Sequence, residues 1–279
     1  MYRIIVDVHD RVTSTMDVAR ENVRSGRVCF DSAGRPHPAG VIAREQIAGR
    51  GQRGRDWYAE PGANLNATYY FRHPRTHPEQ AGTLALLAGV AVLDVLLPLC
   101  TPAMAGAPAA LGLKWPNDLL LNRRKLGGIL IEMIQAPDQD WVALIGVGIN
   151  LSTTHFPDGI ARLATSLHRE GLPCPDWRTL GEQVPASLCL WASIWREQGP
   201  EAILERWRAF DQTPGRHYAT EIEGQTVAGV AVGVDTQGAL LLALPDARVL
   251  SIHTATSLRE QDQALSHHVI SDVQKQCLL

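Results

Sequence analysis

The sequence predicts an α+β fold in two parts, in which a larger mixed domain precedes a small all-β domain. In the first 151 residues the predicted strands outnumber the predicted helices between them. Apolar residues then recur at helical spacing over 179–210, so this region closes the larger domain. After Thr213 the pattern changes to short β-runs separated by Glu-Gly, Asp-Thr-Gln-Gly and Pro-Asp turns, which is typical of an antiparallel barrel or sandwich of about 45 residues.

The N-terminal third contains three predicted strands and two predicted helices. The strands are rich in β-branched and aromatic residues and lie at 2–8, 41–46 and 63–71. A Ser/Thr cap at residues 13–15 predicts a short helix that Gly26 ends. Over 78–97 the apolar residues crowd at helical spacing, which predicts a buried helix.

The middle of the chain returns to strands before the helical region. The Ala/Pro/Gly-rich residues 101–112 predict a loop. Residues 111–134 are expected to form a strand, a turn and a strand, and 141–151 adds a further buried strand. A Gly199-Pro200 break divides the region 179–210 into two helices, because proline cannot continue a helix.

Composition describes an ordinary soluble globular protein and excludes some functions. The chain has 279 residues, of which 45% are hydrophobic and 20% charged. A net charge of −3 and a pI of about 6.4 exclude a global positive field that would hold the protein on nucleic acid or an anionic membrane. The five cysteines are scattered and form no Cys-x-x-Cys pair, so we expect reduced packing residues.

Two further observations predict a cytoplasmic protein without a membrane span. Asp7 and Asp10 interrupt the apolar stretch that a secretory signal requires. The apolar run 84–100 contains Asp94 and Pro98, and it falls short of the roughly 20 apolar residues of a transmembrane helix. We therefore expect that run to be a buried helix.

The stretch AGRGQRGRDW at 48–57 is the first candidate site. Its glycines fit G-x-G-x-x-G, but Asp-Trp-Tyr-Ala-Glu-Pro-Gly follows instead of the helix that a dinucleotide-binding loop needs. Arg50, Arg53 and Arg55 can neutralise phosphate oxygens, and Trp57 can lie against a purine. From this loop alone, a nucleotide-phosphate clamp and a solvated flexible loop are equally good interpretations.

Two further clusters favour the ligand-binding interpretation. KWPNDLLLNRRKLGG places Lys114, Asn117, Asp118 and Lys125 around a tight turn, and the glycines after Lys125 allow close approach of a ligand. Asp118 is a candidate magnesium ligand or a group that orients a lysine, and Lys125 can face a phosphate or carboxylate. GVGINL ends a predicted strand with Asn150, whose amide offers a donor and an acceptor to an adenine edge.

Taken together, these motifs resemble the biotin protein ligase family. The resemblance runs from Thr13-Ser14-Thr15 through AGRGQRGRDW, GANL, KWPNDLLLNRRKLGGILIE and GVGINL to RWRAFD, and it covers nearly the whole chain. It implies a catalytic domain of the class II aminoacyl-tRNA-synthetase-like biotin/lipoate ligase type, with a mixed, mainly antiparallel sheet and flanking helices. It also implies a small C-terminal SH3-like β-barrel. We expect these domains at 1–212 and 213–260, followed by a disordered tail at 261–279.

The resemblance implies a reaction and its ligands. Members of the family join biotin to ATP as biotinyl-5′-AMP, with Mg²⁺, and then transfer biotin to a lysine of a biotin carboxyl carrier domain. By the same resemblance, the catalytic residues are Lys125, Arg50 and Asp118. The expected biotin-binding residues are Ser14, Thr15, Met16, Gln46, Gly49, Arg50, Gly51, Gln52, Lys125 and Gly128. The expected residues for ATP and the adenylate are Arg53, Arg55, Trp57, Asn117, Lys125 and Asn150, with Asp118 as the magnesium ligand.

This chain departs from the family pattern at three places. Met16 stands where many members have Asn, so one polar contact near the ureido ring of biotin is expected to be missing or replaced. Gln52 stands where many members have Arg, which predicts weaker retention of the adenylate. The Ser-Thr motif begins at residue 14, so we expect a monofunctional ligase without the N-terminal DNA-binding domain of bifunctional members.

Other functions remain alternatives at this stage. A lipoate-protein ligase shares the catalytic fold, although KWPND and GRGQRG favour biotin. A non-catalytic biotin sensor would leave the lysine and arginines idle, and a single-stranded RNA binder conflicts with the net charge of −3. The expected partner is a carboxyl carrier domain rather than DNA or a membrane, and pairing of exposed sheet edges into a homodimer stays open.

Overall fold

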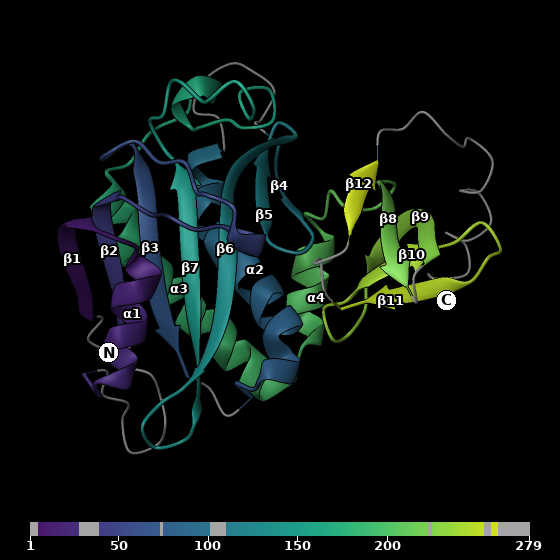
Figure 1. The fold of residues 1–279 in the computed structure, drawn as a ribbon, viewed down its shortest axis with the longest axis horizontal. Helices are drawn as coiled ribbons and strands as arrows, with labels where there is room; N and C mark the ends of the chain where they lie inside the picture. The colour runs from purple at the N-terminus through teal and green to yellow at the C-terminus, as the bar shows by residue number, and fades with distance from the viewer. Residues whose placement is uncertain are drawn as a thin grey trace.

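The computed structural model confirms an α+β architecture with two sheets (Figure 1). It describes residues 5–27, 39–72, 75–100, 110–222, 225–253 and 258–261. The predicted loop at 101–112 falls mostly outside these ranges, as do residues 262–279 of the predicted tail. Gln261, with which that tail was expected to begin, is the last residue of a strand.

The first sheet has seven strands in the order β1-β2-β3-β7-β6-β5-β4 (Figure 1). The strands are β1 (Ile5–Val12), β2 (Ala39–Gln46), β3 (Asn64–Phe71), β4 (Leu111–Lys114), β5 (Asp118–Leu121), β6 (Arg124–Gln135) and β7 (Trp141–Asn150). β1 and β2 are parallel, and the other neighbours pair antiparallel. The sheet is therefore mixed and mainly antiparallel, as predicted.

The segment 111–134 differs from the prediction, since it forms three strands instead of two. The Trp-Pro-Asn turn joins β4 to β5, and the peptide bond before Pro116 is cis. A second turn joins β5 to β6, in which Asn122 and Arg123 have positive φ angles of 49° and 65°. Two adjacent residues in this conformation suit a tight hairpin, but Asn-Arg lacks the glycine that marks such turns in a sequence.

Helices cover both faces of the first sheet, as Figure 1 shows. They are α1 (Thr15–Arg24), α2 (Ala81–Cys100), α3 (Trp177–Gln198) and α4 (Glu201–Arg208), with 3₁₀ turns at Gln52–Gly54, Pro78–Gln80 and His168–Glu170. α1 packs in one apolar cluster with Tyr70 of β3, whereas α2, α3 and α4 share the other cluster with Tyr69. Adjacent strand residues thus face opposite layers. The predicted cap, end and Gly-Pro break of the helices are confirmed.

The apolar helix α2 lies in the core. Together with the preceding turn it spans Pro78–Cys100, and by length and apolar composition it would suit a membrane span. However, 72% of its most apolar part is buried inside the molecule. Burial of this extent is typical of a core helix in a globular protein, as the sequence predicted.

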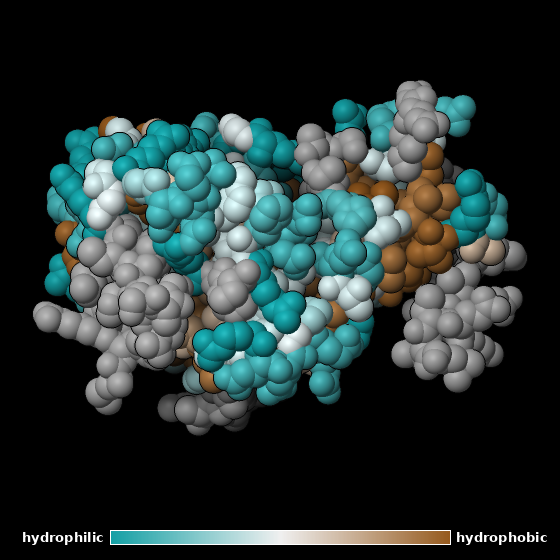
Figure 2. All heavy atoms as spheres, turned by 90° about the horizontal axis from the view of Figure 1, so that it is seen from below, coloured by the Kyte–Doolittle hydropathy of each residue, from teal (hydrophilic) through white to brown (hydrophobic). Residues whose placement is uncertain are grey.

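The second sheet has five strands in the order β11-β10-β9-β8-β12. The strands are β8 (His217–Ile222), β9 (Gln225–Val234), β10 (Leu240–Ala243), β11 (Val249–Ile252) and β12 (Arg259–Gln261). Residues of β8, β9 and β10 belong to the same apolar cluster as α2 and the first sheet. Hydrophobic side chains also gather on the surface of this sheet (Figure 2), where Val249 is 41% exposed.

The two sheets meet at a close contact around Gly238. The indole Nε1 of Trp115 donates a 2.9 Å hydrogen bond to the Gly238 carbonyl. Gly82, at the start of α2, approaches the same residue so closely that a Cβ on Gly238 would lie 2.6 Å from the Gly82 carbonyl carbon. Gly238 also has a φ of +80°. Only glycine meets both conditions without strain.

Replacing Gly238 by alanine should therefore destabilise the protein more than its backbone angle alone explains. Gly215→Ala is a matched control, because Gly215 has a φ of +84° and nothing lies within 4 Å of its added Cβ. Both variants carry the left-handed penalty of roughly 1–2 kcal/mol. Gly238→Ala should lose about 1–3 kcal/mol more through overpacking, as measured by chemical denaturation. Equal losses of stability in the two variants would contradict the close contact between Gly238 and Gly82 of α2.

Candidate functional site

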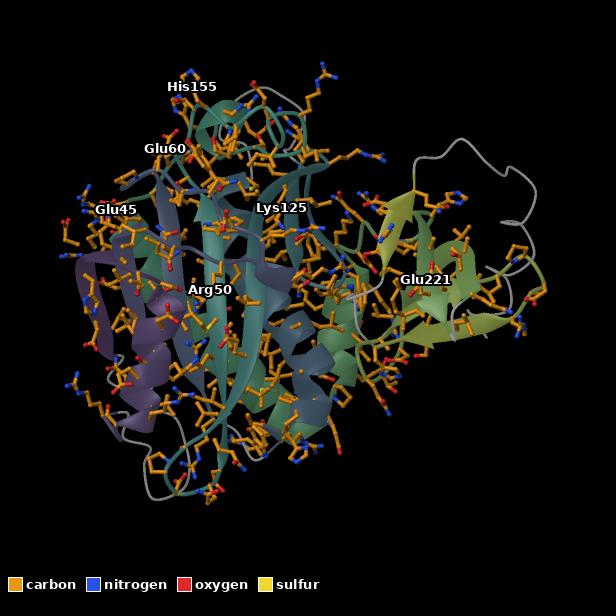
Figure 3. The ribbon with its side chains drawn as sticks, viewed as in Figure 1. Glu45, Arg50, Glu60, Lys125, His155 and Glu221 are labelled. Atoms are coloured by element: carbon orange, nitrogen blue, oxygen red, sulfur yellow. The ribbon has the colours of Figure 1, made fainter. Side chains whose placement is uncertain are left out.

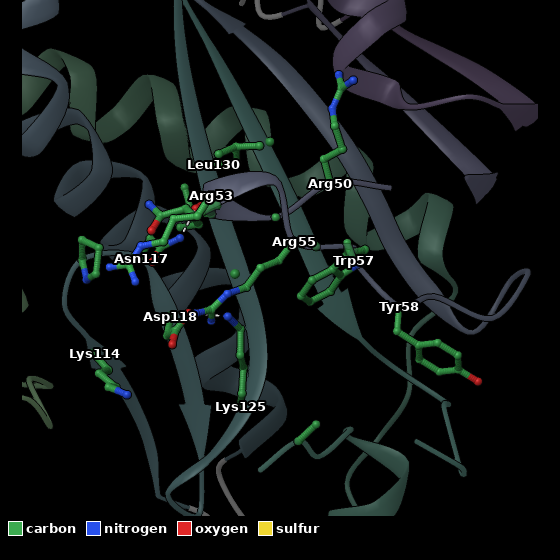
Figure 4. A pocket seen from close by; sticks show the side chains of 18 of the residues that line it. Arg50, Arg53, Arg55, Trp57, Tyr58, Lys114, Asn117, Asp118, Lys125 and Leu130 are labelled. Atoms are coloured by element: carbon green, nitrogen blue, oxygen red, sulfur yellow. Dashed lines mark hydrogen bonds and ion pairs between the residues drawn. The ribbon is translucent and has the colours of Figure 1, made fainter. Parts of the chain in front are cut away.

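A cavity of about 840 Å³ lies where three parts of the molecule meet (Figure 4). They are the first sheet, the second sheet and residues 48–57, which we call the arginine-glycine loop. The structure brings almost all of the predicted site residues to this cavity. Those that line it are Ser14, Thr15, Met16, Gln46, Arg50, Gly51, Gln52, Arg53, Arg55, Trp57, Asn117, Asp118, Lys125, Gly128 and Asn150. Gly49 is not part of the lining, and its carbonyl accepts a 2.9 Å hydrogen bond from the Trp57 backbone.

One end of the cavity is a buried polar corner at the start of α1. The Ser14 side chain caps the helix by accepting from the Met16 backbone N–H at 3.2 Å. The Thr15 N–H and hydroxyl both approach Gln46 Oε1, at 2.8 and 3.0 Å. The Gln46 amide donates to Asn66 Oδ1 at 3.3 Å. This connected network holds its groups in place before a ligand arrives.

Sequence reasoning missed two members of this corner. Thr68 lies 2.9 Å from the Thr15 hydroxyl and lines the cavity, and Asn66 holds Gln46. The signal was present in β3, where Asn64, Asn66 and Thr68 alternate with apolar residues and therefore share one face. Polar residues on a buried strand face mark a site that a motif search does not detect.

Met16 forms an apolar wall of the same corner. It is buried, and its side chain packs so closely to β7 that a Cβ on Gly146 would lie 2.9 Å from Met16 Cε. The residue therefore supplies packing at this position, where many relatives were expected to have a polar Asn.

The arginine-glycine loop is folded on itself by its own backbone. Gly51 N–H donates to the Arg55 carbonyl at 2.7 Å, and Arg50 pairs with Asp56 as an antiparallel bridge. Arg53 has a left-handed φ of 61° at the tip. The loop is thus an ordered turn over the cavity.

Two arginines of this loop are tied to other parts of the molecule. Arg50 forms a 2.5 Å ion pair with Asp17 in the first turn of α1. Arg53 Nη2 donates to the Leu258 carbonyl at 3.1 Å, just before β12 of the second sheet. The loop thereby connects the polar corner to the second sheet.

Like charges gather near Arg53. Burial lowers the pKa of its guanidinium, and the neighbouring charges of Arg55 and Arg259 lower it further. Arg259 lies on β12 and lines the cavity, although no sequence motif indicated it. Three guanidinium groups that repel one another suit a multiply charged anion such as a phosphate chain, and binding of phosphate here stays a prediction.

Trp57 lies against the glycines of two neighbouring strands. A Cβ on Gly148 would lie 2.6 Å from Trp57 Cε2, and one on Gly128 would lie 3.8 Å from Trp57 Cζ3. The indole N–H is buried and has no hydrogen-bond partner within the described part of the chain. Gly148 therefore makes room for this indole, which forms part of the cavity wall. The expected approach of a ligand to Gly128 stays a prediction.

A β-bulge directs Lys125 into the cavity. The β5–β6 register shifts so that Leu119 pairs with Gly127 and Leu120 with Lys125. The extra residue turns the Lys125 side chain toward Gly128, where a Cβ would lie 3.5 Å from its Nζ. Lys125 Nζ forms a 2.5 Å ion pair with Asp118 Oδ1, as Figure 4 shows.

The backbone of Lys125 is held by the segment 163–165. Its N–H donates to the Leu163 carbonyl at 2.7 Å, and its carbonyl accepts from Thr165 N–H at 2.9 Å. The buried Asn150 amide donates to the Thr165 carbonyl at 2.9 Å and accepts from Asn64 at the same distance. Asn150 is 3% exposed, and two such bonds give it a structural role, so its contact with an adenine edge stays a prediction.

Glu170 anchors this segment, and sequence reasoning missed it. Its side chain is 8% exposed and accepts from Arg124, Asn122 and Thr165. The carboxylate thus joins the β5–β6 turn to the segment that holds Lys125. Burial by itself would raise the pKa of Glu170, but hydrogen bonds from Thr165 and Asn122 and the charge of Arg124 outweigh it and hold the pKa of this carboxyl below its usual value.

Asn117 supports the same hairpin. Its side-chain amide donates to the Ile129 carbonyl at 2.6 Å, and its backbone carbonyl accepts from Ile129 N–H at 2.9 Å. Since both groups bind β6, Asn117 orients the strand on which Lys125 lies. This contact is structural, although the side chain also lines the cavity.

Asp118 is the candidate ligand for a divalent cation. Within the described ranges no three His, Cys, Asp or Glu side chains form a metal-binding group. Mg²⁺ usually binds one or two carboxylates together with phosphate oxygens of a substrate. Lys125 occupies Oδ1 of Asp118, which leaves Oδ2 for a cation that arrives with a nucleotide. The donor set fits Mg²⁺ carried by a substrate.

Comparison with known proteins gives consistent matches. Residues 9–150 match the profile of the biotin/lipoate A/B protein ligase family. The biotin–[acetyl-CoA-carboxylase] ligase of Mycobacterium tuberculosis is 36% identical over 203 residues, which cover 72% of each chain.

Solved structures share the fold over most of the chain. The biotin protein ligase of Aquifex aeolicus in complex with biotin and ATP has a TM-score of 0.72 at 22% identity and covers 92% of this chain and 99% of its own. The Leishmania major enzyme in complex with biotinyl-5-AMP has a TM-score of 0.58 at 28% identity and covers 90% of this chain and 99% of its own.

The lowered pKa of Glu170 predicts that acid reduces the stability of the folded protein. A carboxyl whose pKa is lower in the folded protein stabilises it above the unfolded pKa, and this stability is lost as the pH falls through the folded pKa. Glu170→Gln should therefore lose less stability than the wild type as the pH falls from about 5 to 3. Denaturation curves across this range measure the difference. Parallel pH profiles for the two proteins would show that Glu170 is not stabilised in its charged form.

Proposed function

The chain belongs to the biotin/lipoate A/B protein ligase family, and we propose that it is an ATP-dependent biotin protein ligase. It activates biotin as biotinyl-5′-AMP and transfers the biotinyl group to a lysine of a biotin carboxyl carrier domain. One observation carries the proposal, which is a cavity with a polar corner at one end and Lys125 with Arg53 and Arg55 toward the other. The relative from Mycobacterium tuberculosis bears the name of this activity.

The first half-reaction joins two anions. A carboxylate oxygen of biotin attacks the α-phosphorus of ATP, and the bond from that phosphorus to the bridging oxygen breaks. Pyrophosphate leaves with the electron pair. Lys125, directed at this point by the β-bulge, stabilises charge on the carboxylate and the α-phosphate. Arg53, Arg55 and Arg259 neutralise the phosphate chain, so that the two anions can approach.

The second half-reaction moves the biotinyl group. The neutral amine of the carrier lysine attacks the carbonyl carbon of the mixed anhydride. The bond from this carbon to the phosphate oxygen breaks, AMP leaves with the electron pair, and the amine loses a proton as the amide forms. Lys125 is again placed to stabilise the departing phosphate.

Almost every candidate residue has a role that its place in the cavity supports. Thr15 and Gln46 form hydrogen bonds to the ureido ring, and Ser14, Met16, Gly51, Gln52 and Gly128 shape this end. Gly49 lies outside the lining and supports the loop by accepting a hydrogen bond from the Trp57 backbone. Arg50 covers the bound biotin when it leaves Asp17. Trp57 and Asn150 bound the adenine, and Asn117 orients β6. Asp118 would hold Mg²⁺ that arrives with ATP, and the ion would supply positive charge against the triphosphate.

The domain arrangement and assembly extend the proposal. Residues 1–212 form the catalytic domain, and 213–260 form an SH3-like barrel, which the five-stranded second sheet supports. The protein acts in the cytoplasm on a carrier domain of a biotin-dependent carboxylase. A homodimer through the exposed edge strand β1 is a further proposal, tested by the solution mass with and without biotinyl-AMP.

Pyrophosphate exchange tests the activity directly. Biotin with ATP and Mg²⁺ should support exchange of labelled pyrophosphate into ATP. Lys125→Ala should lower the exchange rate by about 10²–10³-fold, because it removes a charge directed at the reacting phosphate. Arg208→Ala, which removes an exposed cation paired with Glu201, is the control and should keep the wild-type rate. Exchange that depends on lipoate instead of biotin would assign the alternative activity of the family.

Gln52 allows a test of how tightly the adenylate is held. It lines the cavity beside Arg53, so Gln52→Arg should add attraction for the phosphate of biotinyl-AMP and slow its release. Gln198→Arg adds the same charge at the exposed end of α3 and serves as the control. Release of labelled biotinyl-AMP from the purified protein gives the rates. If the wild type releases it no faster than Gln52→Arg, Gln52 does not weaken retention.

A further inference from the structure

A second group of cations lines the cavity, and the reaction described above leaves it without a role. Lys114 Nζ and Arg216 Nη1 each lie 2.5 Å from one oxygen of the same carboxylate, that of Glu260. Arg216 is also held by its Nε, which donates to the Gln212 carbonyl at 2.7 Å. All three charged residues line the cavity. Lys114 belongs to the first sheet, whereas Arg216 precedes β8 and Glu260 lies on β12.

An unpaired hydroxyl lies beside these charges. Tyr218 on β8 is 4% exposed and lines the cavity, and its hydroxyl has no hydrogen-bond partner among the residues that the structure describes. Burial raises the pKa of this phenol, and the charges of Glu260 and Asp118 act on it as well. Tyr218 pairs with Glu260 across β8 and β12, so the protonated hydroxyl lies on the strand next to this carboxylate. A buried donor without an acceptor among the described residues is available to a ligand atom.

The position of this group suits the leaving group of the first half-reaction. Arg50 marks the polar corner, because its partner Asp17 lies in the first turn of α1. In the view of Figure 4, Asp118 and Lys125 lie between Arg50 and Lys114. Lys114 pairs with Asp118 across the β4–β5 turn. An in-line displacement places the leaving group opposite the attacking oxygen, which is the side of Lys114.

We propose that Lys114, Arg216 and the Tyr218 hydroxyl form a subsite for the pyrophosphate group, and that the Glu260 carboxylate occupies this subsite as an internal anion until a phosphate ligand displaces it. The inference rests on the proposed function, since it names the leaving-group end of that site. It assigns part of the reaction to the second sheet, which supplies Tyr218 and Glu260.

The charge of Glu260 has two consequences. It neutralises two cations that would otherwise add to the repulsion around Arg53 and Arg259. It also competes with pyrophosphate for the same donors, which weakens binding of the product and favours its release. Hydrogen bonds to Lys114 and Arg216 outweigh the burial of Glu260 and hold its pKa below the usual value, so the carboxylate is charged near neutral pH.

The test measures the KM for pyrophosphate and the KM for biotin in the exchange reaction. Glu260→Gln removes the competing charge, so the KM for pyrophosphate should fall by about tenfold, while the KM for biotin stays the same. Lys114→Met and Arg216→Met should each raise the KM for pyrophosphate by about tenfold. Glu260→Asp keeps the charge and should stay close to the wild type.

The matched control is Glu221→Gln. Glu221 lies on the same strand as Tyr218, but it is exposed and accepts a hydrogen bond from Thr226. Figure 3 shows it on the second sheet, away from Lys125. This variant should leave both KM values unchanged, and thermal unfolding of every variant verifies that it is folded.

The outcomes separate the subsite from the proposed function. An unchanged or higher KM for pyrophosphate in Glu260→Gln overturns the inference, because a purely structural ion pair gives that result. If the wild type shows no biotin-dependent exchange, the proposed function fails, and calorimetric titration with inorganic pyrophosphate and Mg²⁺ then tests the subsite alone. Tighter binding by Glu260→Gln than by the wild type supports the subsite, and equal or weaker binding overturns it.

Discussion

The site depends on how the backbone of Lys125 is held. The β-bulge in β6 turns its side chain toward Gly128 and Asp118, and the segment 163–165 satisfies both its N–H and its carbonyl. Glu170 anchors that segment to the β5–β6 turn with a nearly buried carboxylate. A charge stabilises a transition state best when it is already in place. The support of the Lys125 backbone therefore determines how much this lysine can stabilise the transition state of the proposed reaction.

The cavity collects positive charge in a protein of net charge −3. Several of its cations are paired with a carboxylate of the protein, including Arg50 with Asp17, Lys125 with Asp118, and Lys114 and Arg216 with Glu260. These pairs lower the cost of holding the cations close together. A phosphate ligand can then replace protein carboxylates instead of water at some of these positions, so binding exchanges one ion pair for another.

Local features of the sequence predicted local features of the structure. The Ser14 cap, the Gly199-Pro200 break and the strand patterns depend on neighbours in the chain, and they appear as expected. The turn at Asn122-Arg123 was missed because its left-handed residues are not glycine. The resemblance brought distant motifs to one cavity, but it did not indicate Thr68, Glu170, Arg259 or Glu260. These residues act through contacts between distant segments, which carry no spacing signal of their own.

The second sheet belongs to the site because of Trp115. Trp115 stands in the turn that carries Asn117 and Asp118. In the structure its backbone N–H donates to Thr213 Oγ1, and its indole donates to the Gly238 carbonyl, so it binds the connection to the second sheet and the sheet itself. The same turn therefore presents Asp118 to the cavity and sets the position of Arg216 and Glu260 opposite it. A shift of the second sheet would move Arg216 and Arg259 relative to Lys125, so the geometry of the proposed site depends on the joint between the sheets.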